Sequence, residues 1–365
     1  MKIAGDRVFA FIVATLLVAG IAIFLSASLG LLAREEVSVA RLALSQIVLG
    51  IAPGVVALFI LRFMNPRLLA RLVLPFYVLA LLATALVFVP GLGLTLNGAT
   101  RWLDLGFASV QPAEFLKIGT VLLLAAYLAQ AGRDIRAYTR GLLPFVLITG
   151  IPIALLLLQP NTSTALIIAG TGTTLYVLAG APRRDFAILG IVVVLGAGLL
   201  LAERPYLQKR FMTFLDPSEN PLSSGYQIQQ SLIAIGSGEV FGKGFGQSIQ
   251  KFNYLPEPVG DSVFAVVAEE LGFVGASILI LLFVAFAARG LAIAADAANA
   301  FGAFAATGLT LVIALSAFLN IGAMLGVLPL TGLPLPFISH GGSALLAALA
   351  SVGIILNVAA HRKRP

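Results

Sequence analysis

The acidic residue that ends the longest polar stretch is the side chain best suited to chemistry in this sequence. Asp261 closes the segment of residues 204–260 and stands directly before an apolar run that starts at Val263. A carboxylate held at such a junction can accept a proton from a hydroxyl group. An aspartate there can equally cap the N-terminus of a helix, so a purely structural role stays open.

A second pair of charges lies at the start of another apolar run. Glu114 and Lys117 are three residues apart, and this spacing puts them on one face of a helix. Charges at membrane depth are costly and usually face a partner or a cavity. The pair is therefore either a neutralised structural ion pair or part of a site.

The elements that must position these charges are membrane spans. Of the 365 residues, 59% are hydrophobic and only 11% are charged, far from the averages of soluble domains. The apolar runs have the length of spanning helices and lack the alternation of barrel strands. We therefore predict one all-α polytopic membrane domain (residues 1–365) of ten transmembrane helices, at residues 8–29, 42–64, 68–90, 108–130, 142–158, 162–180, 186–202, 263–288, 300–327 and 343–360.

The basic residues predict the orientation of these spans. If the N-terminus is cytoplasmic, the short inside loops and the termini hold Lys2, Arg7, Arg62, Arg67, Arg71, Arg133, Arg136, Arg140, Arg183, Arg184, Arg289, Arg362, Lys363 and Arg364. The short outside loops hold only Arg34, Arg41 and Arg101. This bias predicts cytoplasmic termini and a long extracytoplasmic loop at about residues 203–262. It also explains the net charge of +7 without nucleic acid. The chain has no cysteine, which excludes disulfides and thiol chemistry.

Several other segments are unusual for simple connections. Trp102, the only tryptophan, lies in an outside loop and suits an interfacial anchor. The cluster at residues 159–164 suits a helix N-terminus. Glu269 and Glu270 follow Asp261 by about two helical turns, and at most one of them can face the same cavity. The Pro- and Gly-rich residues 326–343 cannot continue a helix, so we expect a re-entrant or surface loop above the site.

These segments together resemble the SEDS family of membrane proteins, which includes RodA and FtsW. The resemblance covers residues 97–357 and is closer to the FtsW branch. It rests on the motifs Asn97-Gly-Ala-Thr-Arg-Trp, Gln111-Pro-Ala-Glu-Phe-Leu-Lys, Gly225-Tyr-Gln, Gln230-Ser, Ala234-Ile-Gly-Ser-Gly, Gly242-Lys-Gly, Leu255-Pro-Glu, Asp261, Glu269-Glu-Leu-Gly, Pro334-Leu-Pro-Phe-Ile-Ser and Gly341-Gly-Ser. The chain departs from the family pattern at Val259-Gly260, at Asn161 and at His340, which excludes a histidine next to Asp261 as a helper in catalysis.

The resemblance implies a peptidoglycan glycosyltransferase of the hexosyltransferase class. Such an enzyme polymerises lipid II, a disaccharide pentapeptide on undecaprenyl pyrophosphate, at the outer face of the bacterial cytoplasmic membrane during division or elongation. The reaction inverts configuration and needs one base, for which Asp261 is the candidate. Cations must stabilise the leaving pyrophosphate. The expected substrate contacts are Glu114, Lys117, Arg101, Trp102, Arg210, Lys243, Ser339 and Ser343.

Cofactor and partners follow from the same resemblance. No cofactor is certain, but a divalent cation (Mg²⁺ or Mn²⁺) could be held by Glu114 and Asp261 with phosphate oxygens. The expected protein partners are a class B penicillin-binding protein, whose transpeptidase domain cross-links the strands, and other membrane proteins of the division or elongation complex. The alternative functions are a lipid II flippase, which would place its charges near the midplane, and a non-catalytic scaffold.

Overall fold

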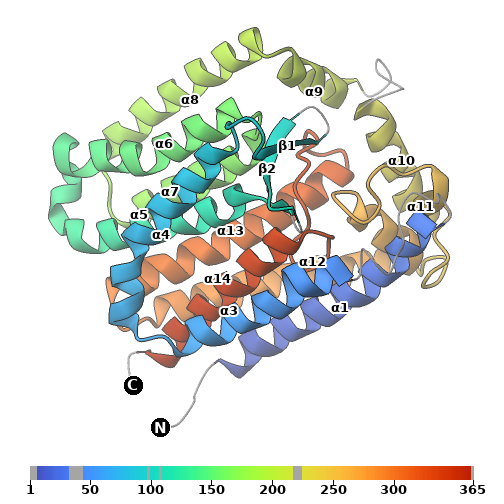
Figure 1. Cartoon of the computed structure of the whole chain (residues 1–365), viewed down its shortest axis with the longest axis horizontal. Coiled ribbons are helices and arrows are strands. Elements are labelled where there is room, and N and C mark those ends of the chain that lie inside the picture. The colour runs from blue at the N-terminus through green and yellow to red at the C-terminus, as the bar shows by residue number, and fades with distance from the viewer. Residues whose placement is uncertain (1–5, 33–43, 97–98, 107–108, 217–223, 363–365) are drawn as a thin grey trace.

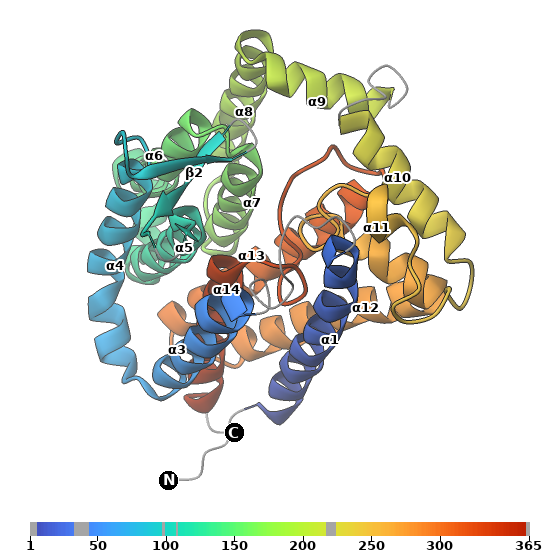
Figure 2. The same ribbon diagram turned by 45° about the vertical axis from the view of Figure 1, so that its right-hand side comes forward.

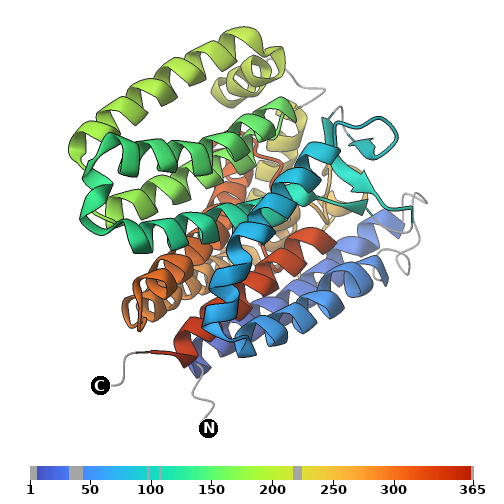
Figure 3. The ribbon, with the colours of Figure 1, turned by 60° about the vertical axis from the view of Figure 1, so that its left-hand side comes forward.

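The computed structural model describes residues 6–32, 44–96, 99–106, 109–216 and 224–362. Over these residues the chain forms a bundle of apolar helices (Figure 1). The first helix begins and the last helix ends at one end of the bundle, and a small β-sheet lies at the opposite end (Figure 3). We refer to these as the termini end and the sheet end.

Nine helical segments of the described residues are long and apolar enough to cross a membrane. They are α1 (Arg7–Leu32), the π-helix η1 (Gln46–Ile51) continued by α3 (Ala52–Phe63), α4 (Pro66–Leu86), α5 (Pro112–Ala131), η3 (Tyr138–Leu142) continued by α6 (Leu143–Leu158), α8 (Arg183–Glu203), α12 (Val263–Ala295), α13 (Ala300–Met324) and α14 (Gly342–Ala360). Between α6 and α8 lies a shorter apolar helix, α7 (Thr162–Leu178). The short helix η2 (Gly132–Arg136) follows α5. The predicted all-α polytopic membrane fold is confirmed, with α7 as the tenth helix.

The core of the bundle lies where α5, α13 and α14 meet. Most residues of these three helices are buried. Close approach is possible because small residues replace bulky ones at the crossings. At Gly353 of α14, an added Cβ would lie 2.6 Å from the carbonyl oxygen of Leu58 in α3. Any larger residue there would therefore push α3 and α14 apart.

Helix α8 lies at the edge of the molecule and has one buried residue, Asp185. The hydroxyl of Tyr176 in α7 donates a 2.7 Å hydrogen bond to the Asp185 carboxylate. Most of the middle of α8 is exposed and apolar, as expected for a helix surrounded by lipid.

The loop before α5 contains three strands that the sequence analysis did not predict. They are β1 (Gly93–Leu96), β2 (Ala99–Asp104) and β3 (Ser109–Val110), antiparallel in the order β1-β2-β3. Because β3 takes up residues 109–110, span four begins at Pro112 and not at residue 108 as predicted. The turn Asn97-Gly98 lies outside the described residues.

The described part of the long polar segment contains helices that the sequence analysis did not predict. It contains α9 (Pro205–Leu215), α10 (Ser224–Ser237) and the single turn α11 (Gln250–Asn253). Together with α8, α9 and α10 form an arch along one side of the molecule (Figure 2). The sequence analysis missed these helices because their polar residues mask the apolar periodicity.

Helix α12 is broken at Gly272, where φ is 66° and ψ is −167°. A straight helix of its 33 residues would be roughly 50 Å long, whereas the apolar core of a bilayer is about 30 Å thick. The break divides α12 into a short helix, residues 263–271, and a span that begins after Gly272. Span eight begins at Val263 as predicted, but the break at Gly272 was not predicted, because a glycine inside an apolar run does not by itself indicate a break.

Candidate functional site

Asp261 lies just before α12 at the sheet end, and two side chains hold its backbone. The side-chain nitrogen of Asn320 in α13 donates 2.7 Å hydrogen bonds to the carbonyl oxygens of Asp261 and Leu333. The hydroxyl of Ser339 donates a 2.6 Å hydrogen bond to the carbonyl of Gly260. The Pro- and Gly-rich segment after α13 therefore lies against Asp261, as the sequence analysis predicted.

The carboxylate of Asp261 faces α10 and Arg210. The Gln227 amide donates a 3.0 Å hydrogen bond to Oδ1 of Asp261. An added Cβ at Gly332 would lie 3.9 Å from Oδ2 of Asp261 and 3.8 Å from Nη2 of Arg210. The two charged groups therefore both lie next to Gly332, at most about 8 Å apart, which is within the range of electrostatic coupling.

The surroundings of Asp261 favour the protonated form of its carboxyl group. Its pKa is raised from 3.8 to about 6, mainly by burial, and the nearby charge of Glu257 contributes in the same direction. The hydrogen bond from Gln227 and the charge of Arg210 act in the opposite direction. A carboxylate with a pKa near neutrality is a better proton acceptor than an ordinary surface aspartate.

Arg101 and Arg210 form a cationic pair near Asp261. Arg101 donates to the carbonyl oxygens of Gln159, over 3.3 Å, and of Pro160. Burial and the charge of Arg210 both lower the pKa of Arg101, so the two guanidinium groups repel each other. Within the described residues neither arginine forms an ion pair with a carboxylate. Two guanidinium groups that repel each other and lack a carboxylate partner favour the binding of an anion between them.

A cavity of about 230 Å³ opens beside this pair. Arg210, Ser163 and Thr331 provide its polar wall. The remaining lining is mostly apolar and comes from α7, α8, α9, α13 and the segment after α13, through Thr162, Leu166, Leu201, Leu207, Phe211, Leu319, Leu328, Pro329 and Leu330. The cavity thus combines a cationic side with a wall that suits a hydrocarbon chain.

Glu114 and Lys117 form a 3.0 Å ion pair at the start of α5, with each side chain only 6% exposed. They line a small cavity, of about 30 Å³, together with Leu333 and Pro334. The pair therefore lies next to the same segment that contacts Asp261. The carboxylate of Glu114 is paired with Lys117, whereas that of Asp261 accepts a hydrogen bond from Gln227. Whether the pair contacts a substrate stays a prediction.

The two serines expected to contact substrate form hydrogen bonds with the backbone, and their contact with a substrate stays a prediction. Besides its bond to Gly260, Ser339 accepts a 2.8 Å hydrogen bond from the N–H of Leu335. Ser343 accepts a 3.1 Å hydrogen bond from the N–H of Gln111, next to α5. Their hydroxyls tie the segment after α13 to Asp261 and to α5, so both are positioning residues in this structure.

Two further expected contacts lie away from Asp261. The ammonium group of Lys243 forms a 2.7 Å ion pair with Glu269, beside the break in α12. Trp102 is half-buried in β2, opposite Leu94 of β1. Neither residue lines the cavities beside Asp261 and Glu114. Glu269 compensates the charge of Lys243, and contact of Lys243 or Trp102 with a substrate stays a prediction.

The residues at which the chain departs from the family pattern have local roles. The N–H of His340 donates a 2.7 Å hydrogen bond to the carbonyl of Val259, and its ring stacks on Phe24 with centroids 5.7 Å apart. Burial lowers the pKa of His340, so this ring is neutral at pH 7. Asn161 precedes α7, and its side-chain nitrogen is buried with no partner among the described residues.

Three residues of the site were not singled out from the sequence. Gln227 and Glu257 lie in motifs that carried the family resemblance, but nothing in those motifs showed which side chain faces Asp261. Asn320 could have been identified from the sequence, because an amide inside an apolar span is costly unless it binds a specific partner.

The carboxylates here allow one kind of metal site. Among the described residues, no three His, Cys, Asp or Glu side chains gather in one place. Mg²⁺ is often held by one or two carboxylates together with phosphate oxygens of a substrate. Asp261 and Glu257, whose charges influence each other, fit that arrangement. Glu114, which is neutralised by Lys117, does not.

Comparison with known proteins agrees with this architecture. Residues 6–364 match the family that groups FtsW, RodA and SpoVE and is described as a cell cycle protein. The chain is 38% identical to stage V sporulation protein E of Bacillus subtilis over 313 residues, 85% of each chain. It is 40% identical to the probable peptidoglycan glycosyltransferase FtsW of Thioalkalivibrio sulfidiphilus over 358 residues, 96% of this chain and 88% of that one.

A solved structure shares the whole fold. That structure concerns the structural coordination of polymerization and crosslinking by a peptidoglycan synthase complex. One of its chains superimposes with a TM-score of 0.77 and 30% identity, over 98% of both chains. The chain studied here therefore belongs to the FtsW/RodA/SpoVE family, which is the SEDS family, and it is FtsW-like.

Proposed function

We propose that this chain is a peptidoglycan glycosyltransferase that polymerises lipid II into glycan strands. The observation that carries the proposal is the position of Asp261, a carboxylate with a raised pKa that lies next to Gly332 together with Arg210. A proton acceptor beside unpaired cations is what transfer of a sugar from a pyrophosphate requires. The name of the Thioalkalivibrio relative supports the same activity.

In the proposed reaction, Asp261 takes the proton of the 4-hydroxyl group on the acceptor sugar. The oxygen then forms a bond to the anomeric carbon of the donor sugar, on the face opposite the pyrophosphate. The bond from that carbon to the pyrophosphate oxygen breaks, and its electron pair leaves with the pyrophosphate. The configuration inverts, so one base suffices and no glycosyl-enzyme intermediate forms.

Arg101 and Arg210 would stabilise the leaving pyrophosphate. Both guanidinium groups lack a carboxylate partner within the described residues, so the anion would relieve their mutual repulsion. Such cations contribute most where water is partly excluded. The apolar wall of the 230 Å³ cavity beside Arg210 would hold the first part of the undecaprenyl chain.

We also propose that a divalent cation binds beside Asp261. Asp261 and Glu257 would hold it together with pyrophosphate oxygens, and it would supply further neutralisation of the leaving group. Loss of activity in a chelator, with recovery on adding Mg²⁺ or Mn²⁺, would support the cation. Full activity in the chelator would exclude it.

We infer that the termini end faces the cytoplasm and the sheet end faces outward, since the basic residues of the short loops favour this orientation. The chain has no native cysteine, so single cysteines can be placed at will. A cysteine at Leu105, next to β2, should react with a membrane-impermeant thiol reagent in intact cells. One at Ala298, between α12 and α13, should react only after lysis. The reverse result would invert the topology.

We further infer that a class B penicillin-binding protein binds this chain, as a partner that cross-links the strands. The support is the overall similarity to a chain of a peptidoglycan synthase complex. The exposed apolar face of α12 suits a single membrane helix, whereas α13, also expected to be exposed, is mostly buried. Failure of the two proteins to co-purify from the native membrane would argue against the assignment.

The decisive test of the proposed function replaces Asp261 by asparagine. Asp261→Asn keeps the size and a capping oxygen but cannot take up a proton, so we expect glycan synthesis from purified lipid II to fall by about 10²-fold or more. The control is Asp104→Asn, at an exposed carboxylate of the same end. Glycan strands at the normal rate from Asp261→Asn would overturn the assignment. Lipid II movement across vesicles without strands from the unmodified protein would indicate a flippase instead.

A further inference from the structure

The depth of the break in α12 follows from its contacts with α1. At the termini end, Arg289 forms a 2.7 Å ion pair with Asp6, next to the first residue of α1. Towards the sheet end, the Ser26 hydroxyl of α1 donates a 2.7 Å hydrogen bond to Glu270. About 20 helical residues separate the two levels, which corresponds to about 30 Å, the thickness of the apolar core of a bilayer. Glu270 and the break therefore lie close to one membrane boundary.

The segment of residues 239–249, which we call the kink loop, is fixed at this depth by backbone hydrogen bonds. The break frees N–H and C=O groups of α12 that a continuous helix would pair. The N–H groups of Phe273 and Val274 donate to carbonyl oxygens of Glu239 and Val240, over 2.9 and 3.1 Å. In return, Lys243 and Gly244 donate to the carbonyl oxygens of Glu269 and Glu270, both over 3.0 Å, and every named group is satisfied.

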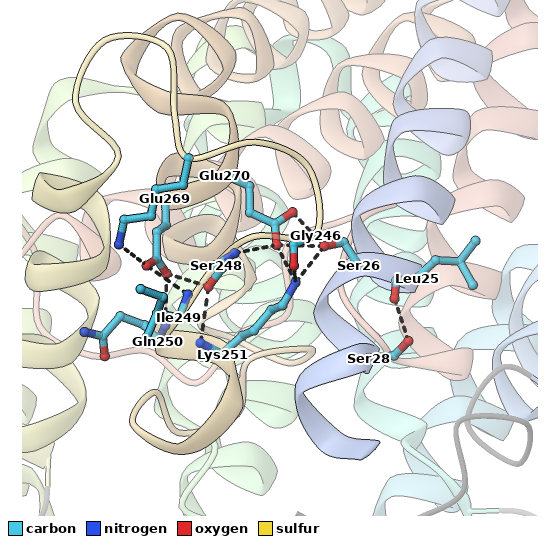
Figure 4. Close-up of polar contacts among 11 residues, drawn as sticks. Leu25, Ser26, Ser28, Gly246, Ser248, Ile249, Gln250, Lys251, Glu269 and Glu270 are labelled. Atoms are coloured by element: carbon cyan, nitrogen blue, oxygen red, sulfur yellow. Dashed lines mark hydrogen bonds and ion pairs between the residues drawn. The ribbon is translucent and has the colours of Figure 1, made fainter. Parts of the chain in front are cut away.

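Two ion pairs, one of them fully buried, connect the kink loop and the residue two positions after it to α12 (Figure 4). Lys243 pairs with Glu269, and Glu269 also accepts hydrogen bonds from the Ser248 hydroxyl and the N–H groups of residues 249 and 250. Lys251, which is 0% exposed, forms a 2.6 Å ion pair with Glu270 and a 3.0 Å hydrogen bond with Ser26. These charges are compensated within the protein, so they need no water at this depth.

Four large apolar side chains are exposed on the kink loop, beside the exposed polar residues Glu239, Lys243 and Gln247. Phe241 is 81% exposed, and Val240, Phe245 and Ile249 are exposed as well. Phe273, on the adjoining turn of α12, is 72% exposed. The exposed charge of Glu239 must stay among the headgroups, which limits how deep the loop can lie.

We propose that the kink loop is an interfacial membrane anchor, whose phenylalanines enter the outer part of the leaflet at the sheet end. Its occupant is phospholipid, because exposed aromatic side chains at a membrane boundary are stabilised by contact with acyl chains about 5–10 Å deep. The backbone pairing with α12 already uses the carbonyls of Glu239 and Val240 and the N–H groups of Lys243 and Gly244, so these groups cannot pair with an added strand of a protein partner. The anchor thereby fixes the end of the short helix, residues 263–271, that lies farther along the chain from Asp261.

Depth-dependent quenching of tryptophan fluorescence tests this anchor. Trp102 is the only tryptophan, so Trp102→Phe gives a background in which Phe241→Trp reports alone. The protein is reconstituted in phosphatidylcholine vesicles that carry bromine either near the headgroup end or near the methyl end of the acyl chains. We expect Phe241→Trp to lose at least roughly half as much emission as a tryptophan in full lipid contact, and more with the shallow bromine, as an interfacial depth predicts.

Two matched positions calibrate the measurement. Leu281→Trp, on the exposed face of α12, reports full lipid contact, and Leu105→Trp, in the loop after β2, reports contact with water. Phe245→Trp replaces Phe241→Trp if that variant is not monodisperse. Quenching of both kink-loop positions by aqueous acrylamide to the extent seen at Leu105, without quenching by lipid, would overturn the proposal. Protection from both quenchers would also overturn it, because protein would then cover the loop.

Discussion

The side-chain amide of Gln227 donates hydrogen bonds to two neighbours at once, the carboxylate of Asp261 over 3.0 Å and the hydroxyl of Ser262 over 2.9 Å. Gln227 belongs to α10, whereas Asp261 and Ser262 start α12. Because the bond stabilises the charged carboxylate, it lowers a pKa that burial raises. The arch of α9 and α10 therefore sets the protonation of the proposed base.

Replacement of Gln227 by leucine should shift the pH dependence of glycan synthesis. Without the amide, the pKa of Asp261 rises above about 6, so the acidic limb of the rate profile moves to higher pH. Activity should recover at alkaline pH, since the carboxylate itself is intact. The measurement is the initial rate of lipid II polymerisation across the pH range. Gln208→Leu, at an exposed position of α9, should leave the limb in place. A rate that falls equally at every pH would mean that Gln227 does not tune Asp261.

Asp261→Asn should make the protein more stable to heat at pH 7.5 while it removes activity. The folded pKa, about 6, lies above the ordinary value of 3.8, so the stability from this group is present below pH 3.8 and is lost as pH rises through 6. Asparagine avoids that loss, which amounts to about 1–3 kcal/mol for a partly shielded group. Apparent melting temperatures should converge near pH 4. An asparagine variant that melts earlier at pH 7.5 would show that the carboxylate has a structural role.

The sequence predicted the spans and the junction at Asp261 because both depend on local patterns. Apolar runs of spanning length, and a single acidic residue at the start of one, are visible without any tertiary information. The same is true of Glu114 and Lys117, whose ion pair follows from their spacing.

The sequence could not predict which distant segments pair. Lys243 was expected beside the leaving group because it carries a positive charge on the expected side of the membrane. Its actual partner, Glu269, is chosen by the backbone pairing of the kink loop with the broken α12. Gly272 did not indicate that break, since glycine is common inside membrane helices. The sequence likewise did not indicate that the Ser339 hydroxyl binds the Gly260 carbonyl.

Arg210→Gln should weaken the use of lipid II much more than the neighbouring Lys209→Gln. Arg210 and Asp261 both lie next to Gly332, whereas Lys209 is exposed on the other side of α9. Loss of one charge-assisted contact to a pyrophosphate corresponds to about 1.5–3 kcal/mol, or roughly 10- to 100-fold in kcat/KM. Arg210→Lys should recover part of this loss, because it restores the charge without the bidentate geometry. Equal effects at both positions would remove Arg210 from the pyrophosphate site.

A double replacement of Glu114 and Lys117 distinguishes a structural ion pair from a substrate contact. Each single variant, Glu114→Gln or Lys117→Met, leaves a nearly buried charge without its partner, so we expect a loss of about 3–5 kcal/mol in stability. The double variant has no unpaired charge and should recover most of that stability, seen in its apparent melting temperature. If the pair is only structural, glycan synthesis should recover with stability. If Lys117 also binds pyrophosphate, the double variant should be stable and still inactive, and this is the result that we expect, since the pair lies beneath the segment that contacts Asp261.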